Sequence, residues 1–430
     1  MKKLLAVLLT VLIFSFAFSE KVVFEFWHAM GGGLGETLSY LIENFNKENP
    51  DIEVKPIYVG NYSALNQKLL STITAYNQGT RSELPTMAQA YGNWIAKYLF
   101  SDVIQPLNEY IENDKEMKDA WDNEIYDVFK EMSTWDENIY SMPYNKSVYT
   151  YYYNTDLFDL YGVEPPKSFD DLIEVSQYLT EDIDEDGNVD QYGLGSRTFV
   201  DDFQLLLYAY DQRILVDKGN GKYAVSLDKT KFKEALSIVK ELKENDNALF
   251  QGGYLDGPFG SGQIAAYMGT IAGKSYADRS SQGKHGWTWS ALPSVDGVPH
   301  SPIAGTDLTV FKWASDEEKE AAFRFLKYLM DPINMAYWAI NSGYVPVRKD
   351  VTQTEQWKVY TATDEKPTIA LNSLETAYSD PKPAAWNDIR GELSNIYSDF
   401  LNDKIDSDEA YSRTIKSLET LLAETDELAK

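Results

Sequence analysis

A strand-helix-strand pattern near the amino terminus is the feature that most constrains the fold. Residues 21–27 are rich in valine and aromatic residues, which favours a strand. After the glycine-rich stretch 31–35, apolar residues recur at helical spacing until Asn49-Pro50, and residues 52–57 form a second strand-like segment. Two strands joined by a helix run parallel, with helices on the faces of their sheet. The pattern therefore predicts an α/β protein.

The rest of the chain continues this mixed pattern. An apolar stripe through Leu65, Leu69 and Ile73 predicts another helix, and residues 85–88 and 148–153 predict strands. Ser168 and Ser315 each precede an acidic residue by three positions, which predicts capped helices beginning after them. Helical patterns dominate the final third. With 430 residues, the chain is long enough for two or three domains.

The first 19 residues have the features of a secretory signal peptide. Lys2 and Lys3 precede an apolar stretch, and small residues lead to Ser19, which predicts cleavage after Ser19. The apolar stretch is shorter than the roughly 20 residues of a membrane-spanning helix. The chain has no cysteine, so it can form no disulfide and carry no lipid on a cysteine. We expect an exported, periplasmic protein without a membrane anchor.

Charge and motif content argue against several classes of function. The formal charge of −28 becomes −30 once Lys2 and Lys3 are removed, which argues against nucleic acid and anionic membranes as partners. The three histidines lack metal-ligand spacing, and no Gly-x-Ser-x-Gly or phosphate-binding Walker motif is present. We therefore predict a protein that is not an enzyme and needs no organic cofactor. A secreted glycosidase with two facing carboxylates remains an alternative.

One acidic segment resembles the start of an EF-hand calcium loop. Its oxygen-bearing residues alternate around Gly187, but Gly193 stands where the loop needs a bidentate glutamate. Two interpretations stay open, a weak structural calcium site and an acidic surface turn. The candidate ligands are Asp182, Asp184, Asp186, Asn188 and Asp190.

Short motifs along the whole chain resemble those of the family 1 extracellular solute-binding proteins, the relatives of maltose-binding protein that serve ABC importers. The motifs are Phe26-Trp27-His28, Asn46-x-Glu48-Asn49-Pro50, Tyr152-Tyr153-Asn154-x-Asp156 and Ser342-Gly343-Tyr344-Val345-Pro346. The resemblance implies a two-lobed type II periplasmic binding protein fold with the ligand cleft between the lobes. The first lobe would comprise residues 20–146 and 303–345, and the second residues 147–302 and 346–430 with carboxy-terminal helices. It also implies a monomer that delivers a small molecule to membrane permease subunits.

Within the family, the chain is most similar to the members that bind glycerol-3-phosphate, through Phe26-Trp27-His28-Ala29-Met30 and Gly60-Asn61-Tyr62. This resemblance implies ligand contacts by six residues, with Arg390 pairing with phosphate or carboxylate oxygens. The six residues are Tyr62, Ser147, Thr270, Gly305, Tyr344 and Arg390.

Two departures from that pattern affect the expected ligand. Gly92 replaces the family's glycerol-binding glutamate, and Thr198 replaces a ligand-packing tryptophan. Glycerol-3-phosphate or a glycerophosphodiester is the first expectation, and the diester fits the departures better. The alternative is a sugar or oligosaccharide stacked on Tyr91, Trp94 or Phe199.

Overall fold

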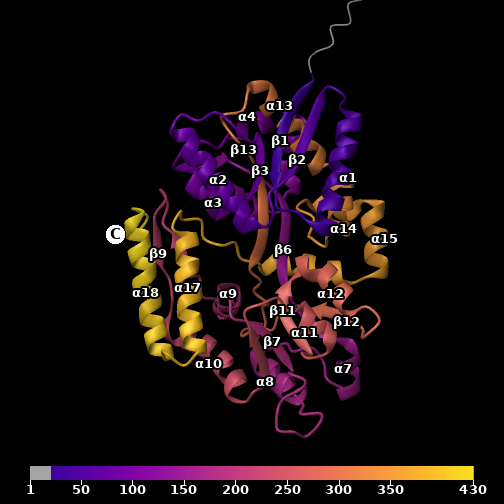
Figure 1. Cartoon of the computed structure of the whole chain (residues 1–430), viewed down its shortest axis with the longest axis vertical. Helices are drawn as coiled ribbons and strands as arrows, with labels where there is room; N and C mark the ends of the chain where they lie inside the picture. Colours follow the sequence, from indigo (N-terminus) through magenta and orange to yellow (C-terminus); the bar gives the residue numbers. More distant parts are fainter. Residues whose placement is uncertain (1–20, 430) are drawn as a thin grey trace, which may run out of the picture.

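The computed structural model describes residues 21–429, which form two lobes joined by long strands (Figure 1). The predicted signal peptide lies outside the described residues. The lobes are α/β, as the sequence predicts.

The first lobe is built on the predicted strand-helix-strand unit. Strand β1 (Val22–His28) pairs in parallel with β2 (Ile52–Tyr58) and with β3 (Met87–Ala90). Helix α1 (Gly32–Glu48) connects β1 to β2 and buries the apolar residues whose spacing predicted it. Helices α2 (Tyr62–Asn77) and α3 (Gly92–Leu99) follow β2 and β3. The predicted parallel unit is confirmed.

Two helices from the last third of the chain return to this lobe. Helix α13 (Asp316–Met330) packs against β1, and α14 (Pro332–Ser342) packs against α1. Ser315 and Glu318 form the predicted capping box of α13. The smaller elements are α4 (Asn108–Asn113), α5 (Lys115–Asp119), a π-helical turn (Ala120–Glu124), α6 (Asp127–Ser133), β4 (Thr134–Trp135) and β5 (Asn138–Ile139).

Strand β6 (Met142–Asn154) links the two lobes. Its first half pairs with β13 (Ile303–Val310) of the first-lobe sheet, and its second half pairs with β11 (Ala266–Thr270) and β12 (Trp287–Ser290). The strands of the described chain therefore connect in the order β10-β7-β11-β6-β13-β3-β1-β2. Because hydrogen bonds run from one lobe to the other through β6, we refer to this strand and β13, which connect the lobes, as the hinge strands.

The second lobe surrounds the other end of that sheet. Strands β7 (Leu194–Arg197) and β10 (Ala248–Gln251) pair in parallel, and α8 (Phe169–Tyr178) begins with the predicted Ser168 capping box. Its other elements are α7 (Thr155–Tyr161), α9 (Val200–Ala209), β8 (Leu215–Asp217), β9 (Tyr223–Val225), α10 (Lys229–Glu244), α11 (Asp256–Ser261), a 3-10 turn (Ile271–Gly273) and α12 (Lys274–Ser281).

The final helices cover one side of the second lobe. Helix α17 (Trp386–Leu401) packs against α9 and α18 (Ser407–Glu424), and α18 also packs against α10. In Figure 1 α17 and α18 lie side by side at the edge of the molecule. The predicted carboxy-terminal helices are confirmed.

The chain between α14 and α17 crosses gradually from one lobe to the other. Arg348 donates to the Met330 carbonyl of α13 at 2.8 Å and bridges Ile125 of the first lobe. Next come a 3-10 turn (Lys349–Gln353), α15 (Glu355–Thr363), which packs on α14, and α16 (Lys366–Asn372), which packs on β12; another 3-10 turn (Ser373–Thr376) follows. The predicted lobe boundaries stay predictions, and these contacts favour a crossing later than residue 346.

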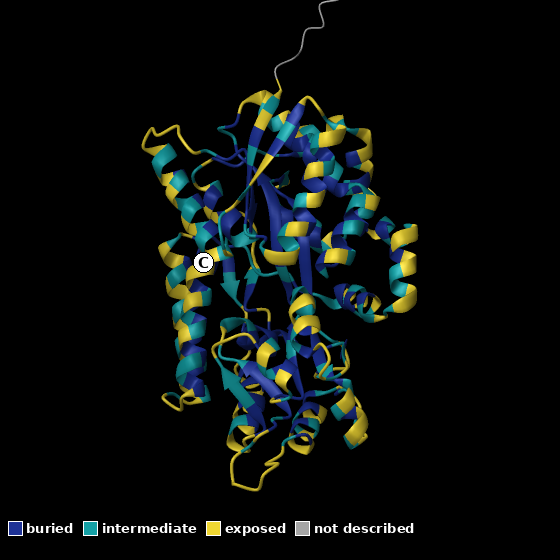
Figure 2. Ribbon diagram, turned by 45° about the vertical axis from the view of Figure 1, so that its right-hand side comes forward, coloured by how far each residue is buried: buried dark blue, intermediate teal, exposed yellow. Residues whose placement is uncertain are grey.

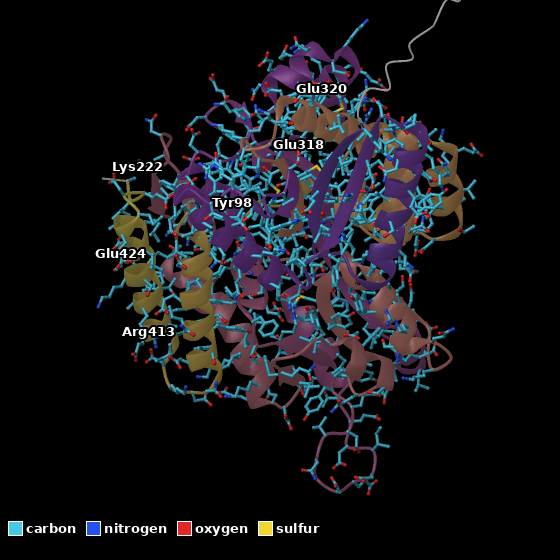
Figure 3. The ribbon with its side chains drawn as sticks, turned by 45° about the horizontal axis from the view of Figure 1, so that its top comes forward. Tyr98, Lys222, Glu318, Glu320, Arg413 and Glu424 are labelled. Carbon is cyan, nitrogen blue, oxygen red and sulfur yellow. The ribbon has the colours of Figure 1, made fainter. Side chains whose placement is uncertain are left out.

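Buried residues concentrate in the strands of both lobes, which Figure 2 shows in dark blue. Between α2 and α3, the Tyr98 hydroxyl, labelled in Figure 3, donates to Asn66 Oδ1 at 2.7 Å. Within residues 21–429, every helix is too short or too polar to cross a membrane.

Candidate functional site

Arg390 is held by a polar network on the second lobe. It lies in the first turns of α17, and its guanidinium forms an ion pair with Asp201 and donates to Gln204 Oε1. Asp201, Gln204 and Tyr208 are three and four residues apart on α9, so they share the face that packs on α17. The packing of two helices therefore fixes the guanidinium.

Asp380, in the loop before α17, is the second carboxylate beside Arg390. Its Oδ2 lies 3.7 Å from Arg390 Nη1. Three uncharged groups also donate to it: the Gln204 amide at 2.9 Å, the Tyr208 hydroxyl at 3.3 Å and the Trp386 indole at 3.1 Å. These contacts hold the Asp380 side chain in place next to the predicted anion-binding residue.

Burial and charge act against each other in this network. Burial alone would raise the pKa of Asp201, but Arg390, by its charge and its hydrogen bond, holds the pKa below its ordinary value. Arg390 itself stays protonated, because Asp201 and Asp380 raise its pKa against the cost of burial. Both members of the pair are therefore charged at neutral pH.

A cluster of aromatic rings forms the first-lobe side of the site. Tyr62 begins α2, Tyr91 caps α3 and Trp94 lies in the first turn of α3. The ring centroids of Tyr62 and Tyr91 are 5.1 Å apart, and those of Tyr91 and Trp94 are 4.9 Å apart, both edge-on. Gly92, one of the two departures noted above, is the first residue of α3 and offers no side chain to the site.

Asn145 on the hinge strand β6 links this aromatic cluster to strands β3 and β13. Its amide donates to the Tyr62 hydroxyl at 3.2 Å, and its carbonyl oxygen accepts from Gln89 of β3 at 3.1 Å and from Thr306 of β13 at 2.8 Å. Burial raises the pKa of the Tyr344 hydroxyl, against hydrogen bonds with Tyr62 and Asn145. Tyr62, Asn145 and Tyr344 therefore form one network at the hinge.

The remaining predicted residues surround the same strand. Ser147 is buried, and its Oγ accepts from the Ala272 amide at 3.2 Å. The carbonyl of Thr270 accepts from the Tyr152 hydroxyl at 2.8 Å. Gly305 has φ of +106°, and a Cβ there would lie 1.9 Å from the Asn145 carbonyl oxygen. Gly305 is thus required by the close approach of two hinge strands.

The two sides of the site lie within electrostatic reach of each other. Burial is the main cause that raises the pKa of Tyr91, and Tyr344 and the charge of Asp201 raise it further. The positive charge of Arg390 lowers it. Tyr254 of the second lobe acts on Tyr91 too, and Tyr276 acts on Tyr344. Lys97 of α3 and Asp388 of α17 approach to 4.0 Å. The ends of α3 and α17 therefore bring the two lobes together at this site.

The exposed side chains of the second lobe include three aromatic residues that lie near this site or beside Arg197. Tyr254 is 79% exposed, Tyr276 48% and Phe199 37%. Phe199 lies beside Arg197, whose guanidinium carbon is 5.6 Å from the ring centroid. Tyr254 lies near enough to Tyr91, and Tyr276 to Tyr344, for its ionised form to raise the pKa of its neighbour. Aromatic rings so placed can stack on the apolar face of a ligand.

Lys382 fastens the Asp380 loop to the first lobe. Its Nζ donates to the carbonyls of Glu131 at 2.5 Å and Thr134 at 2.6 Å, and it lies 4.6 Å from the ring centroid of Trp135. Burial lowers the pKa of Lys382. Asp380 and Lys382, two residues apart, thus contact opposite lobes.

The hinge also contains a buried ion pair. Lys146 Nζ lies 2.7 Å from Asp307 Oδ1, and both side chains are fully buried. The pair crosses from β6 to β13 where their register shifts between Thr306 and Asp307. Burial raises the pKa of Asp307, and Lys146 opposes that rise. Because a buried charge needs its partner, the pair favours this register of the hinge strands.

The acidic loop leaves both earlier interpretations open. Asp182, Asp184 and Asp190 are exposed and offer oxygens within 4.8 Å of one another. Asp182 accepts from the amides of Asp186 and Gly187, and Asp186 accepts from Asn188. Calcium binding stays a prediction.

The six predicted residues lie on or near the hinge strands and on the helices that face each other across the site. Their contacts with ligand stay predictions. The sequence interpretation did not include Asp201, Gln204 and Asp380, which hold Arg390. The helical spacing of Asp201, Gln204 and Tyr208 could have shown from the sequence that they share one helix face. No sequence pattern could have identified Asp380, because it lies in a loop without regular spacing.

Comparisons with known proteins agree with this architecture. The profile of the family described as bacterial extracellular solute-binding protein matches residues 40–365. The sn-glycerol-3-phosphate-binding periplasmic protein UgpB of Shigella dysenteriae is 26% identical over 355 residues, covering 75% of this chain and 74% of that protein.

Two solved structures show the same fold. UgpB from Mycobacterium tuberculosis in complex with glycerophosphocholine has a TM-score of 0.79 at 19% identity, covering 94% of this chain and 99% of that one. The GacH receptor of Streptomyces glaucescens, solved unliganded and with acarbose, has a TM-score of 0.77 at 20% identity, with coverages of 94% and 99%. The maltose-binding-protein-like, two-lobed fold is thereby confirmed.

Proposed function

The chain belongs to the bacterial extracellular solute-binding proteins, and from that premise we propose that it captures a neutral carbohydrate between its lobes and delivers it to an ABC importer. The observation that carries the carbohydrate assignment is the pairing of Arg390 with Asp201 and Asp380, opposite a set of aromatic rings. The family consists of binding proteins, which argues against the glycosidase alternative.

Aromatic rings on both lobes favour a ligand with an apolar face. Tyr254 and Tyr276 are exposed on the second lobe, within the range of electrostatic effects on Tyr91 and Tyr344 of the first. Sugar rings have apolar C–H faces and polar edges, which suits side chains with an apolar body and a polar tip. A sugar ring stacked on these tyrosines would contact both lobes.

The polar groups favour hydroxyl groups over a strongly charged ligand. Around Arg390 the structure offers guanidinium and amide donors together with two carboxylate acceptors. A hydroxyl group both donates and accepts, so it can use each kind of partner. The GacH receptor, which has the same fold, was solved in complex with acarbose.

A glycerophosphodiester is the second candidate. UgpB relatives are named for glycerol-3-phosphate, and the Mycobacterium tuberculosis protein was solved with glycerophosphocholine. Arg390 could pair with one diester oxygen, since the diester carries a single negative charge. The curated relatives and Arg390 support this candidate, and the carboxylates around Arg390 weigh against it.

Binding would favour the closed arrangement of the lobes. A ligand shifts an open-closed equilibrium only through its higher affinity for one state, so both lobes must contact it. Tyr62, Tyr91 and Tyr344 would act from the first lobe, and Arg390 with Tyr254 from the second. Export to the periplasm and a monomeric state belong to the same proposal.

Calorimetric titration of the mature protein tests the assignment. The panel would contain maltose, maltotriose, other oligosaccharides, glycerol-3-phosphate and glycerophosphocholine. We expect at least one oligosaccharide to bind tightly, and Tyr254→Ala to weaken it at least tenfold. Tyr178→Ala, an exposed tyrosine on α8, is the matched control and should leave affinity unchanged. Tight binding of glycerophosphocholine with no oligosaccharide binding would replace the carbohydrate assignment, and release of a hydrolysed product would restore the glycosidase.

A further inference from the structure

We infer that Asp201 and Asp380 act as a charge filter, which makes the ligand site reject phosphate monoester dianions although it contains Arg390. The inference deepens the proposed function, because it rests on Arg390 being part of the ligand site. It assigns the two carboxylates as specificity-determining residues.

The first step is that the carboxylates outnumber the cation they surround. Arg390 carries one positive charge, and its Nη2 and Nη1 atoms face Asp201 and Asp380 respectively. The formal charge of this group of three side chains is therefore −1. The Arg390 and Asp201 side chains are 25% and 32% exposed, so water screens the charges only in part.

The second step is that neither carboxylate is free to turn away. Asp380 accepts from Gln204, Tyr208 and Trp386 as well as facing Arg390. Asp201 lies in the first turn of α9, where the amino-terminal end of the helix stabilises a negative charge. An incoming anion would have to break these contacts or approach against both charges.

The third step is that the neighbouring cation is already paired. Arg197 donates to Asp202 Oδ1 through Nε at 3.1 Å and through Nη2 at 3.0 Å, and Asp202 also accepts from the Arg197 backbone amide at 2.7 Å. Arg197 Nη2 also lies 4.0 Å from Asp201 Oδ2, so its single positive charge is shared between two carboxylates. Arg197 therefore adds no excess positive charge to the site.

The direction of the effect follows from Coulomb's law. A phosphate dianion near Arg390 would be attracted by one positive charge and repelled by two negative charges held beside it. A neutral polyol is not repelled in this way and can still use the same donors and acceptors.

The experiment measures glycerol-3-phosphate binding by calorimetry in the mature protein and in the variants Asp201→Asn, Asp380→Asn and the double variant. We expect a Kd weaker than 1 mM for the wild-type protein, at least tenfold tighter binding for each single variant, and a larger gain for the double variant. Glu419→Gln removes one exposed charge from α18 and should give no gain.

Thermal unfolding shows whether each variant folds. The Asp380→Asn variant could unfold because it weakens the contacts with three donors. The test then rests on Asp201→Asn, because the Asp201 carboxylate is an ion-pair partner at the start of a helix. A Kd below 1 mM for glycerol-3-phosphate and the wild-type protein would overturn the inference. So would a folded Asp201→Asn variant with no gain.

The same titrations separate this inference from the proposed function. A gain of glycerol-3-phosphate binding in protein that binds no oligosaccharide supports the filter and contradicts the carbohydrate assignment. Oligosaccharide binding without any gain in the folded variants supports the assignment and contradicts the filter.

Discussion

The two sides of the ligand site differ in the kind of interaction they offer. The first-lobe side consists of uncharged groups, with Tyr62, Tyr91 and Trp94 in edge-on contact and Asn145 at the hinge. The second-lobe side is a network of ions around Arg390. Under the proposed function, ligand shape would be tested by the first lobe and ligand charge by the second. Each side can therefore be altered separately.

Removing the central ion of the second lobe should have the largest effect. Arg390→Ala leaves Asp201 and Asp380 without their cation, and breaking such a pair costs about 4 kcal/mol. We expect the free energy of unfolding to fall by about this amount and ligand binding to be lost in calorimetry. The control is Arg413→Ala, which breaks the ion pair between Arg413 of α18, labelled in Figure 3, and Asp399 of α17. Asp399 keeps Lys404 as a second partner, so this variant should cost less than about 1 kcal/mol. Equal losses in the two variants would contradict the distinction.

Acid should distinguish the lobes by the pH at which each loses stability. Burial, only partly opposed by a hydrogen bond from Met30, lowers the pKa of His28 in the first lobe to about 4. Between pH 6.5 and 4 the unfolded chain binds a proton that the folded chain does not, so stability falls as pH falls through this window. The total loss is about 3 kcal/mol at about 1.4 kcal/mol per unit of pKa shift.

His28→Asn keeps an acceptor for the Met30 amide and removes the titrating ring, so urea unfolding should lose this pH dependence. Asp201 has a lowered pKa, so its contribution is present above its ordinary pKa and is lost only as pH falls below 3.8. The assignment would be contradicted if the His28→Asn variant lost as much stability as the wild type between pH 6.5 and 4.

Removing one hydroxyl from the first lobe should have a moderate effect. Tyr62→Phe leaves the Asn145 amide without its acceptor at the hinge, which costs about 1 kcal/mol, and it should weaken ligand binding about fivefold. Tyr98→Phe also breaks a hydrogen bond, with Asn66, but away from the site. We expect similar losses of thermal stability and an unchanged Kd for Tyr98→Phe; weaker ligand binding by both variants would show that the effect is not local.

Salt should have the smallest effect. A neutral ligand exchanges no ions with the second-lobe network, so raising sodium chloride from 50 to 500 mM should change its Kd less than about twofold. Glycerol-3-phosphate bound to Asp201→Asn should instead weaken severalfold, as measured by calorimetry at both concentrations. Strong salt dependence of carbohydrate binding to the wild-type protein would contradict the division between shape and charge.

Local patterns in the sequence predicted the elements that carry the site. The spacing of Leu38, Leu41 and Phe45 predicted α1, and Ser168 and Ser315 predicted two helix starts that the structure confirms. These features depend on residues a few positions apart. For that reason they can be recognised without knowledge of the fold.

The charge of the site could not be predicted in this way. Family resemblance pointed to Arg390, but its partner Asp201 is 189 residues away in the sequence. The chain contains 67 aspartate and glutamate residues, and only the packing of α9 on α17 selects which of them face the guanidinium. The identity of an ion pair between distant segments is a property of tertiary structure.

The loop from Asp380 to Lys382 connects the proposed ligand site to a fluorescent side chain. Asp380 faces Arg390, and Lys382 lies over the Trp135 ring of the first lobe. Because only Pro381 separates them, displacement of Asp380 by a ligand would change the position of an ammonium group over an indole. We therefore expect the emission of Trp135 to change on ligand binding, without an attached dye.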